Sequence, residues 1–100
     1  MGTVHAVGAV RIVSVMADAP DIYAGIPLYV QIARIIEAEI RAGDWEPGHP
    51  IPSRTTLAQR FGVAGETARR AQLWLSERWY VVGVPGIGAV VTPTDRWPDA

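Results

Sequence analysis

Residues 52–78, PSRTTLAQRFGVAGETARRAQLWLSER, decide the fold. Ser53 stands where a helix would begin, and its hydroxyl can accept a hydrogen bond from the free amides of a first helical turn. Apolar side chains then recur at helical spacing, at Leu57, Ala58 and Phe61. Gly62 can take the left-handed backbone conformation that ends a helix. These signals predict a short helix between Ser53 and Gly62.

A second helix is predicted from about Gly65 to Arg78. Its buried face would consist of Ala68, Ala71 and Leu75. Val63 would plug the turn of about four residues that is centred on Gly62. Two short helices with small residues at their crossing form the helix-turn-helix pattern. The second helix of such a unit can lie in the major groove of DNA, so we expect helix 65–78 to read DNA.

An earlier helix is predicted to open near Pro27, whose missing amide does no harm in a first turn, and to end at Gly43. Its core face would carry Leu28, Ile32, Ile35, Ile36 and Ile40, spaced by three and four residues. Turn 44–48 follows. We expect Trp45 in this turn to cover the helix as part of the core, in preference to stacking on a ligand.

Two β-favouring runs, 79–84 and 89–92, flank the turn sequence Pro85-Gly86-Ile87-Gly88 and predict a hairpin. Three helices followed by a hairpin make a winged helix-turn-helix, an α+β and mainly helical fold. We assign this domain to residues 26–92. Residues 93–100 are expected to be a frayed, flexible tail.

Residues 1–25 are expected to form an N-terminal extension of strand and linker. The valine-rich segment 4–15 favours a strand, although Gly8 interrupts it. This extra strand could pair with the wing or with another subunit. In a second interpretation, Met16 is the natural start and residues 1–15 are a poorly ordered upstream extension.

Charge is distributed unevenly along this chain of 100 residues, which is the length of one domain with a small core. The net charge is −1, low for a protein that binds nucleic acid, and all nine basic residues are arginines. Residues 21–48 carry two arginines and five acidic residues, whereas residues 49–91 carry five arginines and two acidic residues. The positive excess therefore coincides with the predicted helix-turn-helix, where phosphates would be contacted.

Several classes of protein are disfavoured by the residues that the chain lacks. It has no cysteine, and its two histidines, His5 and His49, are far apart, so we expect no disulfide and no metal site. We find no nucleophile–base set and no phosphate-cradling loop, which predicts a protein that is not an enzyme and needs no cofactor. No apolar run approaches the roughly 18 residues of a membrane span, and no signal peptide is recognisable. We therefore expect a cytoplasmic protein without a membrane partner.

A family pattern emerges when these signals are taken together. The matching positions are Pro27-Leu28-Tyr29-Val30-Gln31-Ile32, then Ile40, Gly43, Pro47, Gly48, Ile51, Pro52 and Ser53, then Leu57, Ala58, Phe61, Gly62 and Val63, then Thr67, Arg69, Arg70 and Ala71, and finally Gly86, Gly88 and Val91. In this order and spacing, the chain resembles the winged-helix DNA-binding domain of the GntR family of bacterial transcription regulators. The resemblance covers about residues 26–92.

The chain departs from the family pattern at positions that matter for DNA. Ala64 and Gly65 stand where the family usually has Ser-Arg, and Thr55 stands where it usually has an arginine, although Arg54 is adjacent. The basic wing residues of the family are Val84 and Ile87 here. Family members also carry a C-terminal effector-binding domain, and we expect no room for one in this sequence.

The resemblance implies a DNA-contacting set. It comprises Arg54, Thr55, Gly65, Glu66, Thr67, Arg69, Arg70, Gly86, Ile87 and Gly88. Arginine can donate two hydrogen bonds to guanine, but the spacing does not decide whether Arg69 or Arg70 faces a base. Thr67 would contact a phosphate or a thymine methyl group, and Arg54 and Thr55 suit a phosphate at a helix start. Glu66 would repel phosphate or select cytosine, while the glycine-flanked wing tip would approach a minor groove.

Two functions are compatible with these residues. The first is a sequence-specific, DNA-binding transcription regulator, a repressor, that acts as a homodimer on a two-fold site. The second is a degenerate winged helix that has lost DNA binding and holds a protein partner through its apolar wing and through Leu73 and Trp74. In the first case Leu73 and Trp74 would form core or a subunit interface.

Overall fold

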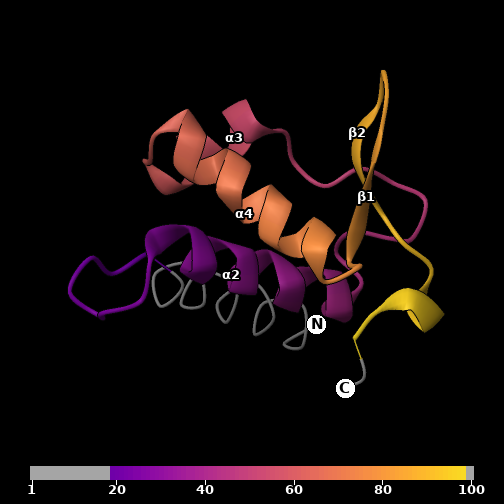
Figure 1. The fold of residues 1–100 in the computed structure, drawn as a ribbon, viewed down its shortest axis with the longest axis horizontal. Helices are drawn as coiled ribbons and strands as arrows, with labels where there is room; N and C mark the ends of the chain where they lie inside the picture. The colour runs from indigo at the N-terminus through magenta and orange to yellow at the C-terminus, as the bar shows by residue number, and fades with distance from the viewer. Residues whose placement is uncertain (1–18, 99–100) are drawn as a thin grey trace, which may run out of the picture.

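The computed structural model describes residues 19–98, so the predicted N-terminal strand lies outside the described residues. The elements are α2 (Leu28–Ala42), α3 (Arg54–Phe61), α4 (Gly65–Glu77), β1 (Val81–Val84), β2 (Gly88–Val91) and the 3₁₀ turn η1 (Thr94–Arg96) (Figure 1). The predicted architecture of three helices and a hairpin is confirmed.

The helix boundaries follow from the local chemistry of the chain. The Ser53 hydroxyl accepts a hydrogen bond from the Thr56 amide at 3.1 Å, which makes Ser53 the N-cap of α3. Gly62, with φ 65°, and Gly43, with φ 91°, end α3 and α2 in the left-handed conformation. Pro27 is the N-cap of α2, one residue before the first helical position expected for it.

The core lies where α4 packs against both α2 and α3 (Figure 1). Its fully buried helical side chains are Ile32, Ala33, Ile36, Ile40, Leu57, Ala68, Ala71 and Leu75. The two alanines of α4 have no side chain beyond Cβ, so the helix backbone can approach its neighbours closely. Trp45 packs against this core and donates a hydrogen bond from Nε1 to Glu39 Oε1 at 2.9 Å, as expected of a core residue.

The hairpin is antiparallel, with Val81 opposite Val91 and Val84 opposite Gly88. Its turn is closed by a hydrogen bond from the Ile87 amide to the Val84 carbonyl at 3.0 Å, and Gly86 supplies the positive φ of 81°. The Ile51 amide also donates to the Ala89 carbonyl at 2.9 Å. The wing is therefore joined to the segment that leads into α3.

The end of the described chain differs from the expected frayed tail, because residues 93–98 fold back onto the domain. Trp97 packs against the core and donates from Nε1 to the Thr92 carbonyl at 3.0 Å. The Arg41 guanidinium lies 5.2 Å from the centre of the Tyr80 ring and 5.9 Å from that of Trp97. Burial of the Trp97 ring and its cation–π contact with Arg41 favour this docked segment over a free end.

The N-caps of α3 and α4 differ in chemistry but not in backbone shape. Ser53 has φ −66° and ψ 164°, and Ala64 has φ −66° and ψ 153°, but Ala64 has no side chain to accept a hydrogen bond. We expect Ala64→Ser to raise the free energy of unfolding by about 1 kcal/mol, and Ser53→Ala to lower it by about the same amount. Thermal unfolding followed by circular dichroism checks this, with a Tm change of about 4–8 °C in each direction. An unchanged Tm for Ala64→Ser would show that other groups already satisfy these amides.

Candidate nucleic-acid interface

The outer face of α4 carries most of the residues predicted to read DNA. The buried side of the helix consists of Ala68, Ala71 and Leu75, which turns the charged side chains outward. Gly65, Glu66, Arg69 and Arg70 are exposed, whereas Thr67 is half-buried. Thr67 is therefore the least accessible of the predicted contacts on this helix.

The first turn of α3 lies next to the first turn of α4. A groove of about 460 Å³ is lined by Arg54, Thr55, Ala58, Gln59, Val63, Gly65 and Glu66. A Cβ atom added at Gly65 would lie 4.0 Å from Arg54 Cδ. The fold thus brings together four predicted residues from two helices: Arg54, Thr55, Gly65 and Glu66.

An ion-pair cluster on α4 joins the two arginines predicted to read DNA. Glu66 accepts from Arg69 Nε at 2.9 Å and from Arg69 Nη2 at 2.7 Å, and from Arg70 Nε at 3.3 Å. The hydrogen bonds from Arg69 are the main cause that lowers the pKa of Glu66 to about 2. From the sequence, Glu66 was expected to repel phosphate or select cytosine, and its pairing with Arg69 and Arg70 was not predicted. The i,i+3 and i,i+4 spacing is the signal that could have revealed the pairing.

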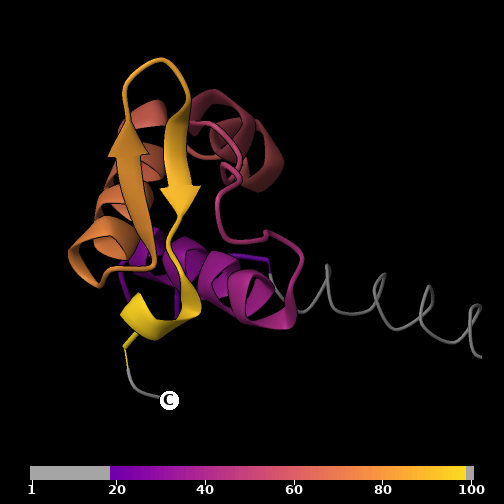
Figure 2. The same ribbon diagram turned by 90° about the vertical axis from the view of Figure 1, so that its right-hand side faces the viewer.

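The wing tip presents a small apolar surface. Gly86, Ile87 and Gly88 are exposed, and Ile87 exposes 61% of its surface. The tip lies on the same side of α2 as α3 does (Figures 1 and 2). Residues 81–91 contain no basic side chain, so any contact of the tip with DNA would involve backbone and apolar groups.

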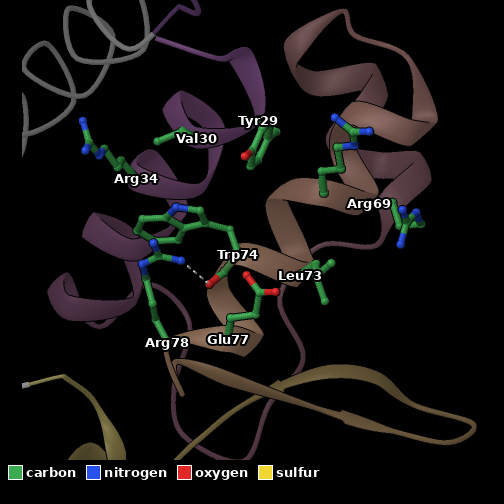
Figure 3. Close-up of a pocket in the computed structure, with 9 residues that line it drawn as sticks. Tyr29, Val30, Arg34, Arg69, Leu73, Trp74, Glu77 and Arg78 are labelled. Carbon is green, nitrogen blue, oxygen red and sulfur yellow. Dashed lines mark hydrogen bonds between the residues drawn. The ribbon is translucent and has the colours of Figure 1, made fainter.

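Leu73 and Trp74 lie further along α4 and line a second groove, shared with α2 (Figure 3). Leu73 is exposed and Trp74 is half-buried. Arg34 and Arg78 line the same groove and were not singled out as functional in the sequence analysis. Arg34 lies in α2 and Arg78 is the C-cap of α4, so no short sequence motif indicates that they share a surface.

Residues 19–98 contain neither a metal-binding cluster nor a membrane-spanning helix. No group of three or more histidine, cysteine, aspartate or glutamate side chains in this range could hold a metal ion. No helix in the same part of the chain is long and apolar enough to cross a membrane.

The domain consists of three helices and a two-strand hairpin, and the outer face of its third helix, α4, carries the neighbouring arginines Arg69 and Arg70. This arrangement defines its class as a winged helix-turn-helix domain. The model of the family described as "Bacterial regulatory proteins, gntR family" matches residues 28–91. The chain therefore belongs to the GntR family of bacterial regulatory proteins, as its sequence pattern indicated.

Two curated relatives illustrate the similarity. The uncharacterized HTH-type transcriptional regulator RB1450 of Rhizobium meliloti (strain 1021) is 38% identical over 72% of this chain. The mannosyl-D-glycerate transport/metabolism system repressor MngR of Escherichia coli (strain K12) is 37% identical over 65% of this chain. The matched regions are 30% and 27% of these relatives, so the chain spans less than a third of their length.

A solved structure supports the same placement. The DNA-binding domain of AraR, determined in complex with operator ORX1, has a TM-score of 0.64 and 33% identity to this chain. The alignment covers 67% of this chain and 81% of the AraR domain. The similarity therefore extends over most of a domain that was solved in complex with an operator.

The low pKa of Glu66 gives a pH prediction. Because the folded pKa of about 2 lies below the ordinary value of 4.5, the stabilisation from these ion pairs is fully present above pH 4.5 and is lost as the pH falls to about 2. Carbon-13 NMR of the glutamate carboxyl groups should record a Glu66 midpoint near pH 2. Arg69→Ala should raise this pKa towards 4.5, and Arg70→Ala should raise it less, since Arg70 contributes one longer hydrogen bond. An unchanged Glu66 pKa in Arg69→Ala would contradict the pairing.

Proposed function

We propose that this chain binds duplex DNA sequence-specifically and regulates transcription, with the outer face of α4 in the major groove. The observation that supports this proposal most directly is that the first turns of α3 and α4 lie together, next to the outward-facing Arg69 and Arg70. The AraR domain, similar over most of its length, was solved with an operator, which supports the same binding mode here.

In this binding mode, Arg69 and Arg70 exchange a carboxylate for a nucleic-acid acceptor. Arg69 already donates two hydrogen bonds to Glu66, from Nε and Nη2. The same pair of donors could bind guanine O6 and N7, or two oxygens of a phosphate. DNA must therefore compete with Glu66 for these guanidinium groups. Once released, Glu66 can accept a hydrogen bond from cytosine N4, so it adds selectivity while it reduces non-specific attraction to phosphates.

The remaining predicted residues take supporting roles. Arg54 and Thr55 contact a phosphate at the start of α3, where the first-turn amides add positive potential. Gly86, Ile87 and Gly88 let the wing backbone approach a minor groove. Thr67, which is half-buried, contributes at the edge of the interface.

A single domain of this size offers few phosphate contacts, and we therefore infer a homodimer on a two-fold operator. MngR is named a repressor, and we propose repression as the mode of regulation here. A regulator of this type acts on the chromosome, which implies the cytoplasm. We propose no enzymatic activity, cofactor or small-molecule effector for residues 26–92.

Genomic binding-site selection tests the proposed function. We expect the wild type to enrich a two-fold motif, and Arg69→Ala combined with Arg70→Ala to lose that enrichment. On the selected duplex, the slope of log affinity against log salt should fall by about two for each bound subunit of the double variant. Arg96→Ala, which removes an exposed arginine outside the interface, is the control and should bind like the wild type. Recovery of the same motif at equal strength by the double variant would refute the assignment of these arginines.

A substitution at Gly65 can test for a gain of DNA binding, because a side chain fits at this position. Gly65 is not in the left-handed region, and an added Cβ would lie 4.0 Å from Arg54 Cδ, which is an ordinary van der Waals contact. Gly65→Arg should bind the selected duplex roughly tenfold more tightly, because it adds a base-edge donor to the first turn of α4.

Gly65→Ala is the matched control for this substitution. It should stabilise α4 by up to about 1 kcal/mol through helix propensity, without tightening DNA binding. Equal affinity gains for Gly65→Arg and Gly65→Ala, measured by fluorescence anisotropy, would show that the helix end does not contact bases.

A further inference from the structure

A second surface, the α2–α4 groove, lies between α2 and the C-terminal half of α4 and has a volume of about 510 Å³ (Figure 3). Tyr29 and Trp74 lie on facing helices and form its aromatic floor, and Leu73 extends that floor with 45% of its surface exposed. Arg34 of α2 and Arg78 at the end of α4 are placed along its rim.

Charge in the α2–α4 groove contrasts with the charge of the whole chain. Four arginines and one glutamate line the groove, in a chain whose net charge is −1. Even when Glu66, which pairs with two of these arginines, is counted, four positive charges face two negative ones. The groove therefore attracts an acidic partner.

The aromatic floor fixes some of these arginines in place. The Arg78 guanidinium lies 3.8 Å from the centre of the Trp74 ring and donates to the Trp74 carbonyl at 3.3 Å (Figure 3). The Arg70 guanidinium lies 6.0 Å from the centre of the Tyr29 ring. A guanidinium stacked on a ring keeps donors at its edge for a carboxylate, so less conformational entropy is lost on binding.

We propose that the α2–α4 groove docks an acidic peptide segment of a partner protein. An apolar side chain of that segment covers Leu73 and Trp74, and its carboxylates pair with Arg34 and Arg78. Aromatic and arginine side chains are the residues most enriched at protein interfaces, which suits this pairing of floor and rim.

Two other occupants fit the groove less well. A DNA backbone supplies charge but no apolar group to cover Leu73 and Trp74. A second copy of the chain that presented the same groove across a two-fold axis would place arginines against arginines, which is unfavourable. The proposed DNA-contacting set does not include Arg34, so this inference can fail while operator binding stands, and the reverse also holds.

Fluorescence anisotropy with a labelled synthetic peptide tests the proposal. The probe carries leucine and tryptophan between glutamates, and a second probe has serine in place of both apolar residues. We expect saturable binding of the first probe to the wild type, and a roughly tenfold loss of affinity in Arg34→Glu. Arg96→Glu, which reverses an exposed arginine in η1, is the control and should retain affinity. Thermal unfolding shows whether both variants are folded.

Four outcomes of the anisotropy experiments would overturn the proposal. They are the absence of saturable binding by the wild type, equal affinity in Arg34→Glu, equal affinity for the serine probe, and displacement of the peptide by random duplex DNA with the same dependence on Arg34. Light scattering provides a further check. If Arg34→Glu converts a dimer into a monomer, a second copy occupies the groove instead.

Discussion

The close packing of α4 against α2 is the constraint on which the rest of the structure depends. Ala68 and Ala71 are fully buried, and their small side chains let α4 approach the isoleucine face of α2. Burial of each isoleucine side chain there is worth about 1.5–3 kcal/mol. Once this apolar face is inside, the helical repeat forces Arg69 and Arg70 to the opposite side, so the core determines which face of α4 is available to ligands.

Features set by a few neighbouring residues could be predicted from the sequence. Ser53, Gly62 and Gly43 act within one turn of their own helix, and the structure confirms all three as caps. The cluster of Arg41, Tyr80 and Trp97 could not be predicted. Its members lie far apart in the sequence, and only the folded chain brings them together. For the same reason only Leu73 and Trp74 of the α2–α4 groove were foreseen as an interface, and the residues that α2 contributes were not.

At the start of α4, Ala64 and Gly65 depart from the family pattern in the functional groups that they provide, not in backbone conformation. Ala64 keeps the backbone angles of an N-cap but provides no acceptor. Gly65 is not in the left-handed region, and an added Cβ would make only an ordinary contact with Arg54 Cδ, so the backbone does not require glycine there. Neither position has a backbone conformation that demands the residue found there. These two positions provide no polar side chain, so this end of α4 can make fewer hydrogen bonds to a ligand.

The docked end of the described chain has a further consequence for larger proteins. Arg41 Nη2 donates to the Tyr80 hydroxyl at 2.6 Å and to the Pro98 carbonyl at 3.1 Å, which attaches the segment after η1 to the last turn of α2. The exit of the chain thus lies at the opposite end of the domain from α3 and the wing tip (Figure 2). A module fused beyond this point would extend away from the reading helix. It could change the orientation of the whole domain by pulling on α2, without blocking access to α4.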